Sequence, residues 1–308
     1  MKYLQLIRYP NLLMLAVMQL IIRYGFLELQ NIPLGLSDWQ YALLVLSTVL
    51  IAAAGYVIND ILDQPTDAEN KPSRVIVGTK ISEEHAYYLY VALNIVGVGI
   101  GFYLANAIER PGFGSAFILI ATLLYFYANT LKQMAVVGNV VVALILAMSV
   151  LIVVAFDILP MMYDYNRAQM LTVSSVLLDY AVFAFIVNLL REMVKDLEDV
   201  NGDYNQGMKT LPIVLGVGRT ARVVFVLSLV PIALLLHYLH TYLFANDLYL
   251  SVIYGLVLVV APLIYFSMRM WSASKKKEFA HLSLVLKFVI FFGIVSMAVI
   301  SYNISHHA

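Results

Sequence analysis

Nine apolar stretches, each long enough to cross a lipid bilayer as a helix, limit what this chain can fold into more than any other feature. A spanning helix needs about 20 mostly apolar residues. Such stretches lie near residues 10–30, 40–58, 85–106, 113–131, 135–156, 171–190, 221–243, 248–268 and 281–302. Because 62% of the 308 residues are hydrophobic and only 12% are charged, one soluble core cannot hold them. We predict an all-α polytopic membrane protein with nine transmembrane helices and a single domain over residues 1–308.

The positions of Lys and Arg predict how this chain is oriented. Alternate segments, counted from the N-terminus, hold 15 of the 19 basic residues, whereas the opposite segments hold only Arg110 and Arg167. Since basic residues accumulate in cytoplasmic loops, we expect the N-terminus inside and the C-terminus outside. We therefore expect a multi-pass integral membrane protein, which would lie in the inner or plasma membrane if the source is a prokaryote. A net charge of zero offers no basic face for nucleic acid, so no nucleic-acid partner is expected.

Two of the inside segments carry aspartates at the same spacing, at positions 0, +3 and +7. The triplets are Asp60, Asp63 and Asp67 after the second apolar stretch, and Asp196, Asp199 and Asp203 after the sixth. At helical spacing each triplet points its carboxylates in one direction, where they repel unless a cation lies among them. The triplets are offset by a constant 136 residues, which predicts an internal repeat of two four-helix halves plus a ninth helix.

Each triplet contains a helix breaker before its third aspartate, Pro65 in the first and Gly202 in the second. Proline removes a helical hydrogen bond, and glycine costs about 1 kcal/mol relative to alanine. We therefore expect the first two aspartates of each triplet at a helix end, and Asp67 and Asp203 on the turns that follow.

The residue types around the triplets predict a magnesium ion and a phosphorylated ligand. Without cysteine, a metal must use oxygen or imidazole ligands. Mg²⁺ favours one or two carboxylates together with phosphate oxygens and water. Basic residues that can neutralise phosphate accompany the triplets, namely Lys71, Arg74, Lys80, Lys132, Arg191 and Lys195. A charge run more often only solvates a loop, but two matched triplets beside apolar spans disfavour that interpretation.

At these residues the chain resembles the UbiA superfamily of intramembrane prenyltransferases. The resemblance covers most of the chain and rests on four ordered motifs. These are N-D-x-x-D-x-x-x-D at 59–67 with K-P-x-R at 71–74, Y-x-x-x-L-K at 127–132 with G-N at 138–139, R-E-M-V-K-D-x-E-D-x-x-G-D at 191–203, and G-M-K-T-L-P at 207–212. The third motif is most similar to the geranylgeranylglycerol-phosphate geranylgeranyltransferase branch.

The resemblance implies an α-helical enzyme that uses Mg²⁺ to transfer an isoprenoid chain, an alkyl group other than methyl, from a prenyl diphosphate. The implied metal ligands are Asn59, Asp60, Asp63, Asp67, Asp196, Asp199 and Asp203, although Asp60 alternatively orients a basic neighbour. The implied catalytic residues are Asp63, Asp67, Asp196, Asp199 and Lys132. The implied substrate-binding residues are Asn59, Lys71, Arg74, Arg191, Lys195 and Tyr127. The site is expected to face the cytoplasm, and Tyr56, Tyr125 and Tyr127 are expected to line its cavity.

The acceptor and the class of protein leave alternatives. A lipophilic acceptor resembling geranylgeranylglycerol phosphate is favoured, and an aromatic acid or quinone precursor is the alternative. A secondary transporter is a third hypothesis, because Arg23 and Lys287 lie within spans and His237 and His240 lie near the end of one. Snorkelling or pairing of these residues is the simpler interpretation. Gly97, Gly99 and Gly101 are expected to let helices approach closely rather than to bind a nucleotide.

Overall fold

The computed structural model describes residues 1–70, 72 and 75–307. Within this part of the chain the regular structure is helical, apart from one isolated bridge between Val77 and Ile81. Nine of the described helical segments are long and apolar enough to cross a membrane, which confirms the predicted number. They are Tyr9–Gln30, Asp38–Leu62, Glu83–Ala107, Pro111–Asn129, Val137–Met161, Arg167–Asn205, Val217–Asn246, Tyr249–Ser272 and Lys276–His306.

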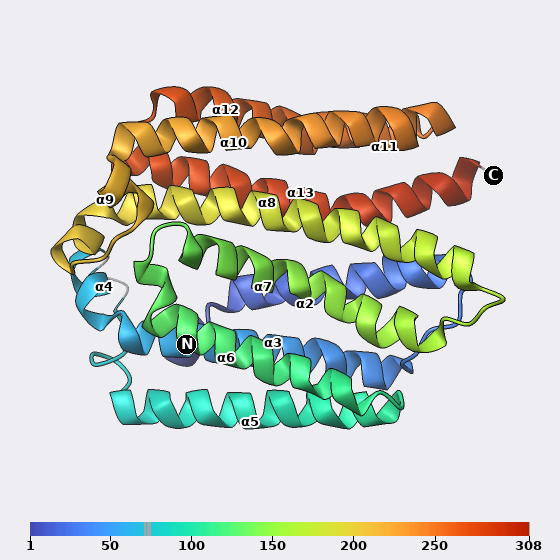
Figure 1. The fold of residues 1–308 in the computed structure, drawn as a ribbon, viewed down its shortest axis with the longest axis horizontal. Coiled ribbons are helices and arrows are strands. Elements are labelled where there is room, and N and C mark those ends of the chain that lie inside the picture. The colour runs from blue at the N-terminus through green and yellow to red at the C-terminus, as the bar shows by residue number, and fades with distance from the viewer. Residues whose placement is uncertain (71, 73–74, 308) are drawn as a thin grey trace. The chain divides into compact units, whose positions relative to one another are not determined.

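Several of these segments are composite, and short helices join them (Figure 1). The long α-helices are α2 (Tyr9–Ile22), α3 (Asp38–Leu62), α5 (Glu83–Ala107), α6 (Ser115–Asn129), α7 (Val137–Val153), α8 (Arg167–Asn205), α10 (Val217–Tyr238), α12 (Ala261–Ser272) and α13 (Lys276–His307). The short ones are α1 (Lys2–Leu6), α4 (Gln64–Asn70), α9 (Leu211–Leu215) and α11 (Tyr249–Gly255). Turns of 3₁₀- or π-helix extend α2, α7, α10 and α11.

The chain forms two compact units. Unit 1 comprises Met1–Leu20 and Ile32–Ala181, and unit 2 comprises Ile21–Asn31 and Val182–Ala308. The division therefore falls inside α8, whereas the offset of 136 residues places it between the fourth and fifth spans. The compact units do not coincide with the predicted halves, and the internal repeat stays a prediction.

Unit 1 is organised around α3, which packs along α5 and α6 (Figure 1). Two glycines on α5 allow this approach: a Cβ at Gly97 would lie 2.9 Å from Ile51, and a Cβ at Gly101 would lie 2.3 Å from the ring of Phe117. The role predicted for Gly97 and Gly101 is thus confirmed. For Gly99 it is wrong, because no atom lies within 4 Å of a Cβ built there.

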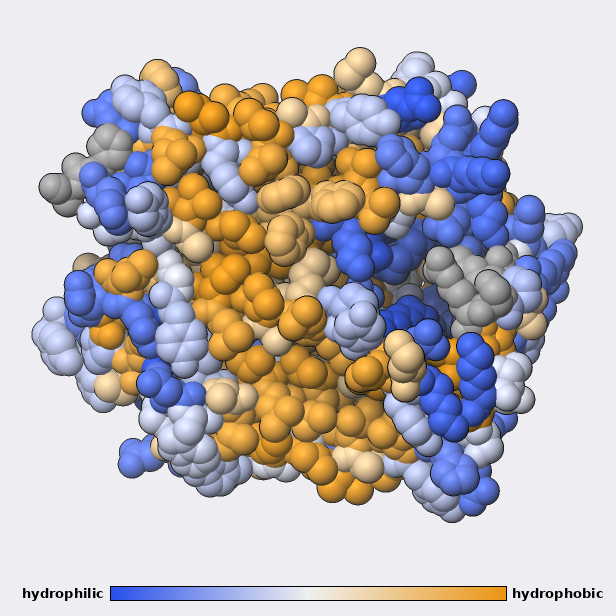
Figure 2. Space-filling view, turned by 180° about the vertical axis from the view of Figure 1, so that it is seen from behind, coloured by the Kyte–Doolittle hydropathy of each residue, from blue (hydrophilic) through white to orange (hydrophobic). Residues whose placement is uncertain are grey.

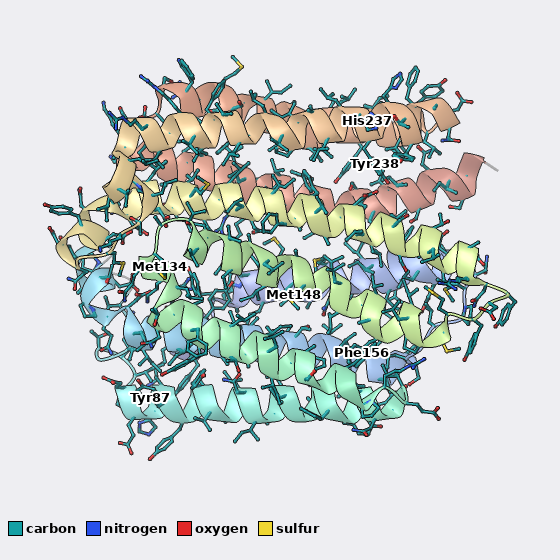
Figure 3. The ribbon with its side chains drawn as sticks, in the orientation of Figure 1. Tyr87, Met134, Met148, Phe156, His237 and Tyr238 are labelled. Carbon is teal, nitrogen blue, oxygen red and sulfur yellow. The ribbon has the colours of Figure 1, made fainter. Side chains whose placement is uncertain are left out.

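Aromatic packing reinforces the same region of unit 1. The buried ring of Phe117 on α6 meets that of Phe156, labelled in Figure 3, with ring centroids 5.5 Å apart. Phe156 lies in the π-helical turn Val154–Ile158 that extends α7. Edge-on contacts of this kind stabilise a core beyond the area that they bury.

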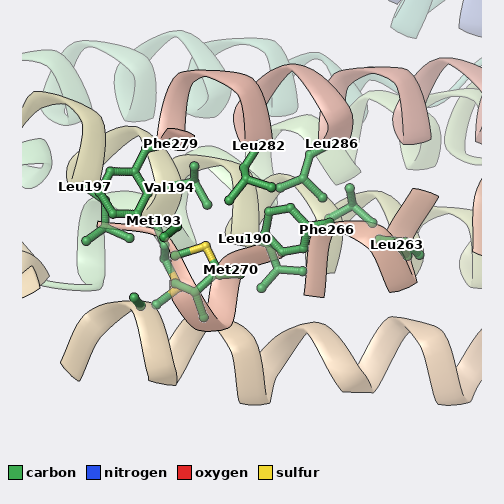
Figure 4. Packing of buried hydrophobic residues seen from close by; sticks show 14 of the residues in the cluster. Leu190, Met193, Val194, Leu197, Leu263, Phe266, Met270, Phe279, Leu282 and Leu286 are labelled. Atoms are coloured by element: carbon green, nitrogen blue, oxygen red, sulfur yellow. The ribbon is translucent and has the colours of Figure 1, made fainter. Parts of the chain in front are cut away.

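The core of unit 2 joins α8, α10, α12 and α13 (Figure 4). Leu190 and Val194 of α8 belong to one cluster with Leu263 of α12 and with Leu282 and Leu286 of α13. All five side chains are almost completely buried. This packing holds α8 and α13 together in the core of unit 2.

The outer surface of the helices is apolar. Large hydrophobic side chains such as Leu13, Ile95, Val226 and Met268 are exposed by 59–70%. Only 17% of the apolar window of Pro111–Asn129 is buried inside the protein. In Figure 2 hydrophobic side chains cover the middle of the visible face, and hydrophilic ones gather toward its two edges. A surface of this kind fits a bilayer as its solvent.

Candidate active site

The first acidic motif lies where α3 gives way to α4. Asn59 and Asp60 belong to the last turn of α3, Asp63 follows its final residue, and Asp67 lies in the first turn of α4. Pro65 lies in the same first turn, where a helix tolerates proline because the N–H that it lacks needs no partner there. The predicted helix break in this motif is therefore confirmed, but the expectation that Asp67 lies on a turn is wrong, because a new helix, α4, begins at Gln64 and includes it.

Asp63 is the centre of a partly buried network in unit 1. Lys132 donates a hydrogen bond from Nζ to Asp63 Oδ1, and Asn59 donates from Nδ2 to Oδ2 over 2.6 Å. The side chains of Lys132 and Asp63 are 10% and 15% exposed, so this ion pair is well shielded from water. The structure thus brings together three residues that the sequence assigned to the site, across a separation of 69 residues.

Gly138 explains why Lys132 is held in this place. Lys132 lies in the 3₁₀ turn Leu131–Gln133 between α6 and α7. A Cβ at Gly138 would lie 2.7 Å from both the carbonyl oxygen of Leu131 and the Cα of Lys132. Only glycine therefore lets the turn fold back onto the start of α7. Met134, which follows the turn, lies at the same end of unit 1 as α4 (Figure 3).

Asp60 has a different partner, which the sequence analysis missed. Arg8 donates from Nη2 to Asp60 Oδ1 over 2.8 Å, and its guanidinium lies 5.0 Å from the ring centroid of Tyr56. Asn11 donates to the Tyr56 hydroxyl over 3.2 Å. The structure therefore has Asp60 orienting a basic neighbour, the alternative stated above to a role as metal ligand. No local pattern pointed to Arg8, because 52 residues separate it from Asp60.

Arg8 occupies an unusual backbone position between α1 and α2, with φ of 51°. Burial lowers the pKa of its guanidinium, but the charge of Asp60 and the hydrogen bond to it raise it by more, so the pKa of Arg8 stays above its ordinary value. Arg8 is thus a permanent cation beside the first motif.

The second motif lies on a continuous helix, which corrects the sequence analysis. The sixth helical segment was expected to end near residue 190, and Asp203 to lie on a turn beyond Gly202. Instead α8 continues through Gly202 to Asn205, so Asp196, Asp199 and Asp203 share one helix. The physical reason is that glycine keeps its N–H and costs a helix only about 1 kcal/mol, whereas proline costs about 3 kcal/mol.

The helix ends at Asn205 and is capped at Gly207, whose φ of 72° only glycine adopts readily. The N–H of Met208 donates to the carbonyl of Asp203 over 2.9 Å, and the N–H of Gly207 donates to that of Tyr204 over 3.0 Å. These two bonds form a Schellman cap. The G-M-K-T-L-P motif thus begins with the glycine that closes α8.

Glu192 is a further charged residue of this region that the sequence analysis left unassigned. Glu192 lies one turn before Asp196 on α8. Glu192 and Asp203 are each only 7% exposed. Lys195 donates from Nζ to Glu192 Oε1 over 2.6 Å, and Arg191 Nη1 approaches the same oxygen at 3.4 Å. Two predicted substrate-binding residues therefore face a buried carboxylate.

The donor atoms of both motifs fit a hard cation, since they are carboxylate and amide oxygens. Within the described residues no three carboxylate or imidazole groups are close enough to form a metal site by themselves. Asp63 is instead engaged with Lys132, and Asp60 with Arg8. Each motif is thus chemically suited to Mg²⁺, and in the first motif Asp60 and Asp63 are neutralised by basic side chains.

Of the remaining predicted residues, some lie outside the part of the chain that the structure describes, and two tyrosines of α6 differ in their burial. Lys71 and Arg74 lie outside the described residues. Tyr127 is partly buried near the end of α6, whereas Tyr125 is 40% exposed and packs edge-on against Phe126, which does not support a place in a cavity.

Two of the residues that motivated a transporter hypothesis, Arg23 and His237, show ordinary contacts. The guanidinium of Arg23 lies 3.5 Å from the carboxylate of Glu28. His237, labelled in Figure 3, is exposed and contacts Thr241 over 3.5 Å. These contacts match the simpler interpretation given above.

The sequence is similar to that of known prenyltransferases. The sequence profile of the UbiA prenyltransferase family matches residues 29–300. A digeranylgeranylglyceryl phosphate synthase of Saccharolobus solfataricus is 30% identical over 295 residues, covering 94% of this chain and 95% of that protein. The protein of the same name from Korarchaeum cryptofilum is 35% identical over 199 residues, and that match spans 64% of each chain.

Solved structures share the fold. A UbiA homolog from Archaeoglobus fulgidus, bound to DMAPP and Mg²⁺, has a TM-score of 0.59 at 17% identity and covers 96% of this chain and 99% of its own. A structure described in connection with digeranylgeranylglyceryl phosphate synthase in membranes has a TM-score of 0.61 at 22% identity, covering 97% of both chains. At these identities the likeness supports the predicted all-α architecture.

Proposed function

The chain belongs to the UbiA prenyltransferase family, and from this premise we propose that it transfers a geranylgeranyl chain from its diphosphate to geranylgeranylglyceryl phosphate. The observation that carries the proposal is the similarity to the S. solfataricus synthase over 94% of the chain. A product with two geranylgeranyl groups on one glyceryl phosphate requires an acceptor that already carries one.

The reaction exchanges one carbon–oxygen bond for another. The allylic C1–O bond of the donor breaks, and diphosphate leaves with the electron pair. The free hydroxyl oxygen of the acceptor bonds to C1 and loses its proton. The apolar spans keep water away from the electron-deficient carbon, because water is a competing nucleophile.

Mg²⁺ fits the donor atoms of the site, and the A. fulgidus homolog binds it together with DMAPP. When bound, it neutralises charge on the diphosphate and makes it a better leaving group. We assign its binding to Asn59, Asp63 and Asp67 of the first motif and to Asp196, Asp199 and Asp203 of the second. Asp60 is left to Arg8, with which it forms an ion pair at 2.8 Å.

The ion pair between Lys132 and Asp63 can be exchanged for contacts with the diphosphate and with Mg²⁺. In the structure the Lys132 ammonium neutralises Asp63. The diphosphate is the stronger partner for Lys132, because the whole group carries more negative charge than one carboxylate. Transfer of Lys132 to the diphosphate releases an Asp63 oxygen for the metal. Ion pairing within the protein is thus exchanged for pairing with the substrate and its metal.

The basic residues outside this pair complete the proposed donor site. Lys71 and Arg74 are proposed to contact the diphosphate, with Tyr127 beside it. The excess of basic residues on the N-terminal side of the predicted topology supports a site that faces the cytoplasm. The single domain over residues 1–308 remains part of this proposal.

The test is a transfer assay with the purified protein in lipid nanodiscs. Mg²⁺ and radiolabelled geranylgeranyl diphosphate are supplied with geranylgeranylglyceryl phosphate or, in parallel, with 4-hydroxybenzoate or a naphthoate. We expect a labelled ether lipid that is lost with EDTA and in Asp63→Asn. The matched control Asp247→Asn, an exposed aspartate in the loop before α11, should retain activity. An aromatic product would refute the ether-lipid assignment, and no diphosphate release with any acceptor would refute prenyl transfer.

A further inference from the structure

The N-terminal segment of unit 1 supplies a cation to the first acidic motif. Arg8 donates from Nη2 to Asp60 Oδ1 over 2.8 Å, and its guanidinium lies 5.0 Å from the ring centroid of Tyr56. Tyr56 and Asp60 are four residues apart on α3, so they lie on one face of that helix. Asn11 of the same N-terminal segment donates to the Tyr56 hydroxyl over 3.2 Å. The guanidinium of Arg8 therefore has two partners on α3, and one of them is held in place by a second contact.

The backbone around Arg8 is also fixed. Its φ of 51° lies in the left-handed region, which a residue other than glycine keeps only when the surrounding structure requires it. Leu6, two residues earlier, is fully buried in a cluster with Val57 and Ile61 of α3. On the other side, the carbonyl oxygen of Arg8 accepts a hydrogen bond from the N–H of Asn11 over 2.9 Å. The position of the guanidinium is thus determined by the fold and not by Asp60 alone.

The two cations of the first motif differ in how they are held. Lys132 carries a compact ammonium on a flexible stem, and a diphosphate can draw it away from Asp63. The guanidinium of Arg8 is planar and always protonated, and it contacts a carboxylate and an aromatic ring together. A substrate would have to replace both contacts at once. Because Asp60 is only 12% exposed, it also needs a counter-ion more than a carboxylate in water does.

Asp60 is close to the residues that are assigned to the metal. It follows Asn59 directly and is three residues before Asp63. Residues at this spacing on a helix have Cβ atoms about 5–6 Å apart. A carboxylate without a counter-ion at that distance would add its negative charge to the motif and attract a divalent ion. Together with Arg8, Asp60 contributes no net charge.

We propose that Arg8 is a positioning residue that holds Asp60 outside the metal coordination and thereby lowers the affinity of the first motif for a divalent ion. This inference rests on the proposed function and deepens it, because it gives the N-terminal segment a part in the active site. Arg8 takes the place at Asp60 that a further metal ion would otherwise occupy. A limited affinity allows the metal to leave with the diphosphate after each turnover.

The experiment measures Mn²⁺ binding by electron paramagnetic resonance, which reports the unbound ion without any turnover. The full-length protein is placed in nanodiscs of phosphatidylcholine with geranylgeranyl thiolodiphosphate, a slowly reacting analogue of the donor. The variants are Arg8→Met, Arg8→Lys, Asp60→Asn and the double variant with Arg8→Met and Asp60→Asn. Lys2→Met is the matched control, since Lys2 is an exposed cation of the same segment that donates to a backbone carbonyl. Thermal unfolding checks that each variant is folded.

We expect Arg8→Met to bind Mn²⁺ at least about 10-fold more tightly than wild type. A unit charge about 6 Å from a divalent ion has an effect of this size even at the dielectric constant of water. Arg8→Lys should lie between the two, because it keeps the charge but not the planar contacts. The double variant should return to wild-type affinity, since it removes both charges, and Lys2→Met should match wild type.

Arg8→Gly separates the charge from the backbone. Glycine adopts a φ of 51° without strain, so this variant loses the cation and keeps the turn. It should bind Mn²⁺ as tightly as Arg8→Met does. It also provides the test if Arg8→Met fails to fold. Unchanged or weaker Mn²⁺ binding in Arg8→Gly would overturn the inference.

The double variant separates the inference from the proposed function. If it binds Mn²⁺ as weakly as Asp63→Asn, then Asp60 is itself a metal ligand and the inference is overturned, while metal-dependent prenyl transfer stands. If wild type binds no Mn²⁺ in the presence of the donor analogue, the metal assignment of the proposed function is refuted, and the role of Arg8 with it.

Discussion

The ion pair between Lys132 and Asp63 predicts strong energetic coupling between two turns that lie far apart in the chain. The two side chains are 10% and 15% exposed, so removal of one leaves a charge largely shielded from water. Breaking a buried pair in this way costs about 3–5 kcal/mol. Lys132→Met and Asp63→Asn should each destabilise the protein by an amount toward the lower end of that range, because some exposure remains.

The double variant removes both charges and leaves neither unpaired. Its destabilisation should therefore be smaller than the sum of the single effects, with a coupling energy of about 1–3 kcal/mol. The assay is a double-mutant cycle of unfolding free energies, measured by SDS titration in mixed micelles. A parallel cycle on Arg8 and Asp60 serves as the control, because Arg8 is 40% exposed and its coupling should be weaker.

Additivity of Lys132→Met and Asp63→Asn to within about 0.5 kcal/mol would refute the reasoning, since independent sites behave in that way. The activity of the same variants gives a second readout. All three should lose prenyl transfer, including the double variant whose destabilisation is less than additive, because both residues are proposed to act on the diphosphate or its metal.

Two further predictions concern glycines whose surroundings differ. Gly101→Ala should destabilise unit 1 by about 1–3 kcal/mol, because its Cβ would lie 2.3 Å from the fully buried ring of Phe117. Gly99→Ala should be neutral or stabilising by up to about 1 kcal/mol, because no atom lies within 4 Å of a Cβ at this position. The same SDS titration compares them, and equal effects would contradict the packing argument. Gly207→Ala should cost about 1–2 kcal/mol, because φ is 72° at the end of α8. Hydrogen exchange should then be faster for the amides of Gly207 and Met208 that close the helix, and unchanged exchange would show that the cap does not depend on glycine.

The sequence predicted correctly those features that depend on neighbouring residues. Stretches of about 20 apolar residues indicate spanning helices because the thickness of the bilayer sets their length. The break at Pro65 followed from the missing N–H of proline. The failure at Gly202 has the same local origin, since glycine only weakens a helix and the aspartates before and after it continue on α8.

By itself, the sequence determined the class of protein and the chemistry of its donor atoms, because hydropathy and aspartate spacing are read along the chain. The tertiary structure alone decided which carboxylate meets which cation. Lys132 reaches Asp63 across 69 residues, and Arg8 reaches Asp60 across 52. Gly138 and the positive φ of Arg8 position those cations through contacts and backbone geometry that have no sequence period. Pairing between distant turns depends on how helices pack, and side-chain packing is specified by the whole fold rather than by any one motif.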